Sequence, residues 1–179
     1  PLVALHAYWR GAQLAPCTLP WWLLAGGGRT GTRPGSSFGS ELSAAGDTSF
    51  PIIGIPLDGR PGTAAIADTD GGLFDEDPVW DRAVGPMQFI PGTWNRWATD
   101  GNGDGTADPH NIYDAAAAAA AYLCFGRSDL TEDAAMRAAL LSYNRSVPYG
   151  NEVLSQAERY REALDLPDLP EPSVARPAS

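Results

Sequence analysis

The chain has 179 residues, 44% of them hydrophobic and six of them tryptophan, so it can bury a core and is not disordered as a whole. Its formal net charge of −10 argues against a nucleic-acid partner, because such a partner requires a basic stripe. No apolar run reaches the roughly 18 residues that cross a bilayer, so no transmembrane segment is predicted. The length favours a single domain at residues 1–166, followed by a Pro-rich tail at 167–179.

The first half of the chain predicts two helices and an irregular insert. Apolar residues at helical spacing predict a helix over residues 2–15, and a second is expected from Trp21 to about Gly27, where a run of glycines begins. Residues from about 33 to 82 are rich in Gly, Pro, Ser, Thr and Asp. We interpret them as a functional loop or a small β insert, because the apolar stretch 50–56 inside them needs burial.

The second half predicts four more helices. They are expected after Pro91, from Asp114, from Thr131 to about Ser142, and over about 151–164. Asp114 is expected to cap a helix of seven consecutive alanines, which favours close packing against its neighbours. Thr131 has the side chain of an N-cap. The total of about six helices with one irregular insert predicts a mainly α fold.

The sharpest local motif is the run from residue 100 to residue 108, DGNGDGTAD. It fits the first six positions of an EF-hand loop. In such a loop the alternating side chains of Asp100, Asn102 and Asp104 direct oxygens toward one centre. Gly105 permits the sharp turn, and the carbonyl of Thr106 can supply a further ligand. This set of hard oxygens predicts a calcium site.

The end of this loop departs from the EF-hand pattern. Asn111 stands where the twelfth position expects Glu, and Asp114 is the better candidate for the last carboxylate. The alternative is a turn rich in Asp and Asn that binds no metal.

The two cysteines, Cys17 and Cys124, lie far apart in the sequence. Two buried free thiols and a disulfide that closes a long loop are both compatible with this spacing. A disulfide would place the protein outside the cytosol.

Three strings, LPWWLLAG at 19–26, AVGPMQFIPGTW at 83–94 and SYNRS at 142–146, occur in this order with the Asp100 loop before the last. Together they resemble the membrane-bound lytic transglycosylase B-like family, lysozyme-like enzymes of the soluble lytic transglycosylase group. The resemblance covers residues 2–164. It implies a lysozyme-like, mainly α domain that cleaves the β-1,4 bond between N-acetylmuramic acid and N-acetylglucosamine of peptidoglycan glycan strands and leaves a 1,6-anhydro end.

The resemblance also implies substrate-binding residues. Gln88 matches a cleft glutamine that hydrogen-bonds sugar, and Met87 would line the same cleft. Tyr143 and Asn144 match a Tyr-Asn pair near the reacting sugar, and Tyr149 is a candidate for sugar stacking. The alternative for each is structural: Gln88 and Asn144 could satisfy buried backbone groups, and Tyr143 could belong to the core.

Compartment and cofactor follow from the same resemblance. It implies an extracellular or cell-envelope location, a Cys17–Cys124 disulfide, and a structural calcium ion whose last carboxylate is Asp114. We expect a monomer. A calcium-dependent adaptor, in which the loop itself captures a partner, is a further alternative.

The general acid of the family is missing at its expected place. The resemblance places a Glu after the second helix, in a string of the type Gly-Arg-x-Glu, and here the matching position is Gly31. Glycine cannot donate a proton to the glycosidic oxygen. One alternative is therefore a homologue that binds glycan without cutting it. Another is a reading-frame error at this point of the sequence. Residues 31–34 can be encoded by codons from which the removal of one base gives a Glu codon at the expected position.

Overall fold

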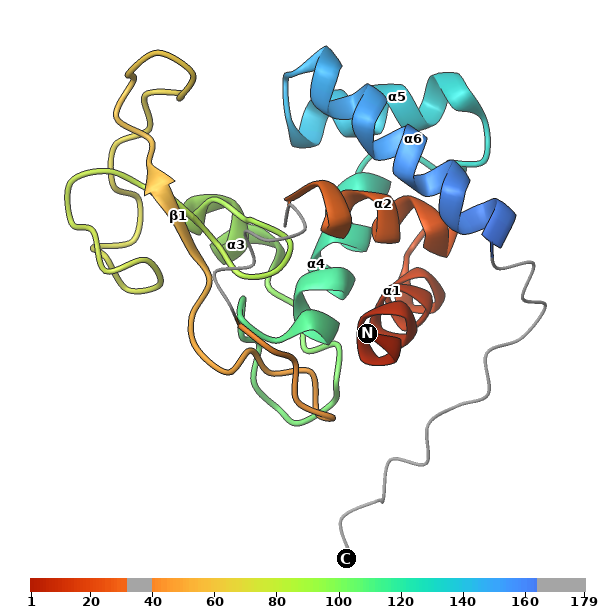
Figure 1. Ribbon diagram of the computed structural model, residues 1–179, viewed down its shortest axis with the longest axis horizontal. Coiled ribbons are helices and arrows are strands. Elements are labelled where there is room, and N and C mark those ends of the chain that lie inside the picture. The colour runs from red at the N-terminus through yellow and green to blue at the C-terminus, as the bar shows by residue number, and fades with distance from the viewer. Residues whose placement is uncertain (32–39, 164–179) are drawn as a thin grey trace, which may run out of the picture.

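The computed structural model describes residues 1–31 and 40–163, and this part of the chain is mainly helical. Figure 1 shows a lobe of packed helices beside a lobe of loops around a short strand. The helices and strands are α1 (Leu2–Leu14), α2 (Trp21–Gly31), β1 (Ile53–Pro56), β2 (Arg82–Val84), α3 (Pro91–Trp97), α4 (Ile112–Cys124), α5 (Asp133–Tyr143) and α6 (Val147–Ala163). The six helices and the two-stranded sheet of these described ranges confirm the mainly α prediction and are consistent with a lysozyme-like fold.

The helical lobe is built around α2, which packs against α1 and α6, while α1 packs against α4. The alanines of α4 allow this close approach. A Cβ added at Gly11 of α1 would lie 3.0 Å from the backbone of Ala116, which is itself fully buried. The interpretation of the alanine run as a tightly packed helix is confirmed.

The second helix continues past its expected end at about Gly27 and reaches Gly31. Tertiary packing explains the difference. A Cβ at Gly26 would lie 2.5 Å from the carbonyl oxygen of Val153 in α6, and one at Gly28 would lie 2.1 Å from the hydroxyl of Tyr8. The glycines thus let α2 touch its neighbours, and this contact offsets their poor helix propensity of about 1 kcal/mol each.

The alanine helix begins two residues earlier than expected. Asn111 is its N-cap and accepts a hydrogen bond from the N–H of Tyr113 at 2.9 Å. Asp114, the expected cap, lies in the first turn instead. The prediction of Asp114 as the cap was therefore wrong. The side-chain oxygen of Asn111, three residues before Asp114, accepts the free N–H of Tyr113, so the helix begins there.

The starts of the last two helices also differ from the prediction. α5 begins after Glu132, which makes no capping hydrogen bond through its side chain, so Thr131 is not the N-cap. α6 begins at Val147 rather than near residue 151. Pro148 is compatible with this start, because a proline in the first turn of a helix removes no intrahelical hydrogen bond.

A disulfide joins Cys17 to Cys124, which confirms the predicted bond. It ties the segment between α1 and α2 to the C-terminal end of α4. Within the described ranges, no helix is both long enough and apolar enough to cross a membrane.

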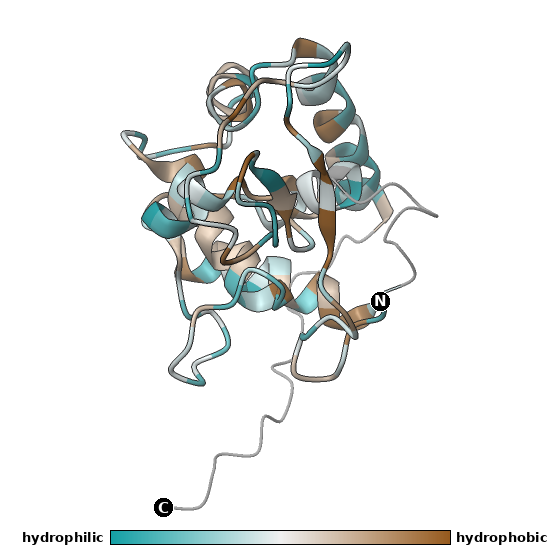
Figure 2. Cartoon of the chain, turned by 90° about the vertical axis from the view of Figure 1, so that its left-hand side faces the viewer, coloured by the Kyte–Doolittle hydropathy of each residue, from teal (hydrophilic) through white to brown (hydrophobic). Residues whose placement is uncertain are grey.

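The irregular lobe contains the small sheet. β1 and β2 are antiparallel, with Ile53 opposite Val84 and Pro56 opposite Arg82. Figure 2 looks onto this lobe and shows the hydrophobic colour of the strand. A small two-stranded sheet is therefore present in the region where a β insert was expected, at about 33–82, and its second strand continues to Val84. The tail predicted at 167–179 lies outside the described residues.

Candidate functional site

A tight hairpin after β2 presents two of the residues predicted to bind sugar. Val84 and Phe89 exchange backbone hydrogen bonds of 2.7 and 2.9 Å, so the four residues between them form a closed turn. Gln88 in this turn has φ of +55° and donates its side-chain N–H to the carbonyl of Gly85 at 2.9 Å. A non-glycine residue in this conformation is strained, and strain of this kind gathers at functional sites.

Tyr143, the last residue of α5, packs onto this hairpin. Its hydroxyl donates to the carbonyl of Met87 at 3.0 Å, and its ring lies 5.6 Å from that of Phe89. Burial, with the neighbouring Tyr149 and Tyr122 hydroxyls, raises the pKa of Tyr143 well above its usual value of 10. Tyr143 is therefore a neutral hydrogen-bond donor that holds the hairpin against α5.

The end of α2 reaches the same hairpin. A Cβ at Gly27 would lie 3.7 Å from the terminal methyl group of Met87. Gly31, the last residue of α2, follows one turn later, and residues four apart share a helix face.

The remaining predicted sugar-binding residues follow Tyr143 along the chain. Asn144 is exposed at the C-terminal end of α5, where its side-chain oxygen accepts the N–H of Ser146 at 3.1 Å. Tyr149 lies in the first turn of α6, and burial raises its pKa to about 12. The structure therefore brings Tyr143 into contact with Met87, next to Gln88 in the same hairpin, and places Asn144 and Tyr149 shortly after Tyr143 in the chain.

A cavity of about 660 Å³ lies beside α2 and reaches Pro86 of the same hairpin, but none of the predicted sugar-binding residues lines it. Its lining includes Tyr8, Gly28, Arg29 and Glu41. Glu41 is exposed to solvent, whereas the chemistry of the family needs an acid in a dry, apolar setting. This cavity does not replace the missing acid at Gly31.

The predicted calcium loop is held by its own side chains. The two carboxylate oxygens of Asp100 accept the N–H groups of Gly103 at 2.6 Å and Gly105 at 2.8 Å. Asp104 accepts the N–H of Thr106 at 2.8 Å, and the amide of Asn102 donates to Asp104 at 2.9 Å. Carboxylate, amide and carbonyl oxygens are therefore gathered in one short turn, and this donor set fits a hard cation in kind.

Asp114 fastens the same loop to α4. Its carboxylate, 1% exposed, accepts backbone N–H groups from Gly101, Asn102 and Asp108 at 2.8, 3.2 and 2.9 Å. Burial raises the pKa of Asp114, while these hydrogen bonds oppose that shift. In this arrangement both oxygens of Asp114 organise the backbone of the loop.

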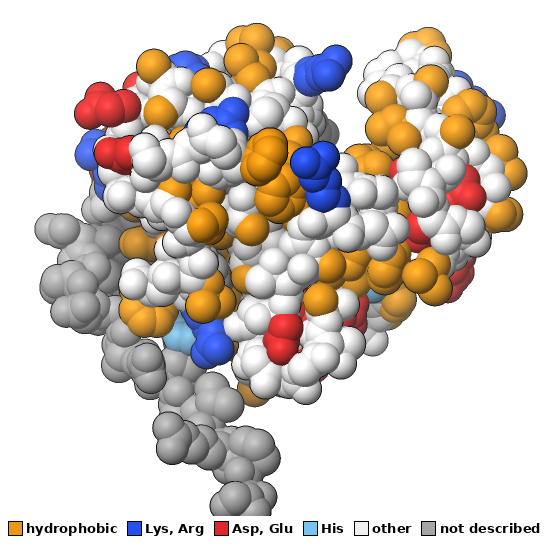
Figure 3. All heavy atoms as spheres, turned by 180° about the vertical axis from the view of Figure 1, so that it is seen from behind, with side chains coloured by type: hydrophobic (Ala, Val, Ile, Leu, Met, Phe, Trp, Pro, Cys, Tyr) orange, Lys and Arg blue, Asp and Glu red, His pale blue; other side chains and the backbone are white. Residues whose placement is uncertain are grey.

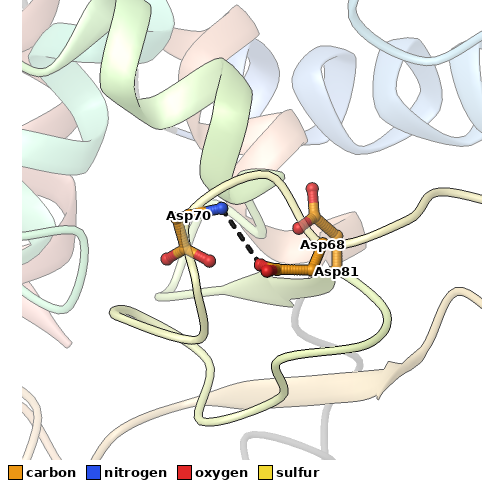
Figure 4. A group of neighbouring side chains, drawn as sticks. All are labelled: Asp68, Asp70 and Asp81. Carbon is orange, nitrogen blue, oxygen red and sulfur yellow. Dashed lines mark hydrogen bonds between the residues drawn. The ribbon is translucent and has the colours of Figure 1, made fainter.

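Three other carboxylates, those of Asp68, Asp70 and Asp81, come together in the irregular lobe (Figure 4). Their oxygens lie within 4.8 Å of one another. Each carboxylate accepts backbone N–H groups of the loop, as from Asp70 to Asp68 at 3.0 Å and from Thr69 to Asp81 at 2.8 Å. Asp81 is fully buried. None of the sequence motifs described above contains this cluster. The recurring Asp residues before each turn are the signal that could have indicated it.

His110 links the loop before α4 to the irregular lobe. Its Nδ1 accepts the N–H of Ile52 at 3.2 Å, so this nitrogen is unprotonated. Burial lowers the pKa of His110 below 6.5, and Asp108 and the backbone of Phe74 oppose the shift. The folded protein thus binds a proton at His110 less readily than the unfolded chain does.

We therefore expect the free energy of unfolding to fall as the pH drops from about 7 to about 5, because protons then favour the unfolded chain. Urea denaturation at several pH values measures this slope. His110→Asn should flatten it, since the Asn oxygen can still accept from Ile52 but does not titrate. An unchanged slope in the variant would assign the pH dependence to other groups.

The comparison with protein families gives one match. Residues 78–129 match the family described as Transglycosylase SLT domain. The match supports the lytic transglycosylase family in its broad sense. The matched lytic transglycosylase segment includes the Met87–Gln88 hairpin, α3, the Asp100 loop and α4, but neither Gly31 nor Tyr143. No curated protein and no solved structure matches the chain. The SLT domain implies peptidoglycan as substrate and the cell wall as the place of action.

Proposed function

We propose that this chain is a lytic transglycosylase-type protein of the membrane-bound lytic transglycosylase B-like kind, in the cell envelope or outside the cell. Its reaction class is cleavage of the β-1,4 bond between N-acetylmuramic acid and N-acetylglucosamine, with a 1,6-anhydro product. The observation that supports this most is the convergence of three elements: the end of α2, the Met87–Gln88 hairpin and Tyr143 of α5.

The chemistry assigned to this site needs one protonated carboxylic acid. It would donate its proton to the glycosidic oxygen and then, as a carboxylate, accept the proton of the sugar's C6 hydroxyl, which attacks C1 and closes the anhydro ring. Most glycosidases use two carboxylates, and this family is expected to use one. Position 31 is where this acid would stand, and Gly31 offers no such group.

A second candidate function is peptidoglycan binding without cleavage, and Gly31 is the specific observation that favours it. The Met87–Gln88 hairpin and Tyr143 are intact, so the surface that would contact sugar is retained. The release of 1,6-anhydro muropeptides from purified peptidoglycan distinguishes the two functions. Release by this chain would assign cleavage to it, and binding without release would assign the second function.

We also propose that the Asp100 loop binds Ca²⁺ as a structural ion. Asp100, Asn102, Asp104 and the carbonyl of Thr106 would hold it, and Asp114 would keep the loop in place from α4. The ion would stabilise the connection between α3 and α4 and would take no part in bond cleavage.

Calcium is accordingly expected to stabilise the fold. A ligand present at a hundred times its dissociation constant stabilises the folded state by about 2.7 kcal/mol, so Ca²⁺ should raise the melting temperature by several degrees, and EDTA should reverse the shift. Asp104→Asn should reduce the shift. Asp133→Asn, at an exposed carboxylate of α5, is the matched control and should leave it unchanged. A full shift in the Asp104 variant would place the ion elsewhere.

A further inference from the structure

A continuous run of aromatic rings leads from the candidate site to the surface. Tyr143 lies 5.2 Å from Tyr122, Tyr122 lies 5.4 Å from Trp97, and Trp97 lies 5.2 Å from Phe125, measured between ring centroids. Phe125, directly after α4, is 59% exposed. Trp97 is thus two ring contacts, and Phe125 three, away from Tyr143, the tyrosine that contacts the Met87–Gln88 hairpin.

Arg96 lies over this end of the run. Its guanidinium carbon is 5.5 Å from the ring centroids of both Trp97 and Phe125. Among the residues that the structure describes, the side chain of Arg96 makes no hydrogen bond and no ion pair. The guanidinium is therefore held in position by two rings while its N–H groups remain available to a ligand.

The neighbouring Arg127 has a different role, because its N–H groups are already used. They donate to the carbonyls of Leu123, Phe125 and Ala138 and to the hydroxyl of Ser142, at 3.0 to 3.2 Å. Arg127 therefore fixes the backbone of Phe125 against the end of α5. The surface under Arg96 is held in place by these contacts.

We propose that Arg96, Trp97 and Phe125, here called the arginine-aromatic platform, bind a carboxylate of the peptide stem of peptidoglycan while the glycan occupies the candidate site. This inference rests on the proposed function. The stem is attached to N-acetylmuramic acid and carries free carboxylates and small apolar side chains. A guanidinium binds a carboxylate with two parallel hydrogen bonds, and the exposed ring of Phe125 can contact the apolar side chains.

Charge and geometry favour a carboxylate over a stacked sugar at the arginine-aromatic platform. Arg96 lies 5.5 Å from both ring centroids, so a sugar cannot stack on the ring faces that the guanidinium covers. The chain as a whole has a net charge of −10 and repels anions, so an anionic stem requires a local cation. Figure 3, seen from behind, shows basic and hydrophobic side chains side by side below the hollow between the lobes.

Isothermal titration calorimetry on the full chain tests this inference with three probes. They are the N-acetylglucosamine–N-acetylmuramic acid disaccharide without peptide and with its lactyl carboxyl group amidated, the same disaccharide carrying L-Ala-D-Glu, and that second probe with its carboxylates amidated. The carboxylate-bearing probe should bind about tenfold more tightly than the amidated one. Arg96→Gln should remove this advantage and leave the affinity for the peptide-free disaccharide unchanged.

Two further variants control for general effects. Arg137→Gln removes a charge from an arginine already paired with Asp133, and it should leave all three affinities unchanged. Arg96→Lys keeps the charge without the planar fork and should recover only part of the advantage. Equal affinity for the two peptide probes, or an equal loss for all three probes in Arg96→Gln, overturns the inference and leaves the proposed function standing. A chain that binds none of the probes overturns both.

Discussion

Gly31→Glu is expected to give the chain release of 1,6-anhydro muropeptides from purified peptidoglycan, at a rate roughly 10²–10⁴-fold above that of the chain with glycine. Position 31 ends α2, one turn after Gly27, where an added Cβ would lie 3.7 Å from the terminal methyl group of Met87. A carboxyl group partly buried against apolar side chains has a raised pKa and remains protonated near neutral pH. Muropeptide separation by chromatography, with mass spectrometry of the anhydro ends, measures the release.

Gly31→Gln is the matched control for this prediction. Glutamine has almost the same size as glutamate but carries no carboxylic proton, so it should restore no release. Release by the chain with Gly31 would show that another carboxylate supplies the proton. Inactivity of the Glu variant would leave glycan binding as the better-supported function. A frame error is tested separately by reading the nucleotide sequence across codons 27 to 36.

Gly85→Ala is expected to have the largest effect on stability, a loss of about 3–5 kcal/mol in the free energy of unfolding. Gly85 has φ of +73°, a conformation that costs an alanine energy in itself. A Cβ at this position would also lie 1.8 Å from the carbonyl oxygen of Pro109. Because this contact is with backbone, a rotamer change cannot relieve it, and the hairpin must move away from the segment before α4.

Gly62→Ala separates the cost of the backbone conformation from the cost of the close contact. Gly62 has φ of +92°, but no atom lies within 4 Å of the added Cβ. Its variant should therefore lose only the conformational part, about 1–2 kcal/mol. Urea denaturation of both variants gives the comparison. Similar losses at the two glycines would show that the contact with Pro109 is absent or easily relieved, and would weaken the placement of the hairpin against this segment.

Several elements of the fold could be predicted from local sequence alone. The α1 helix follows from apolar spacing, and the alanine run of α4 follows from propensity and small volume. The disulfide, by contrast, was predicted from the resemblance and the compartment it implies, because cysteine spacing alone allows free thiols as well. The structure joins Cys17 to Cys124.

The boundaries of the helices were less predictable, because distant residues decide them. Propensity places the end of α2 near Gly27, and only the packing of Gly26 on Val153 and of Gly28 on Tyr8 explains its continuation to Gly31. A one-dimensional pattern contains no information about a neighbour more than a hundred residues away. The cap of α4 is a different case, because Asn111 bonds the nearby N–H of Tyr113 and a local pattern could have indicated it.

For the candidate site, the sequence by itself determined which functional groups the proposed site residues offer: the amide of Gln88, the hydroxyl of Tyr143 and no side chain at Gly31. These are properties of single residues and their order. Only the tertiary structure decided that Tyr143 holds the carbonyl of Met87, and that Arg96 is stacked on two rings without a hydrogen-bond or ion-pair partner within the described ranges. Such contacts depend on how helices pack, and packing is set by the shape of the whole core rather than by any local run of residues.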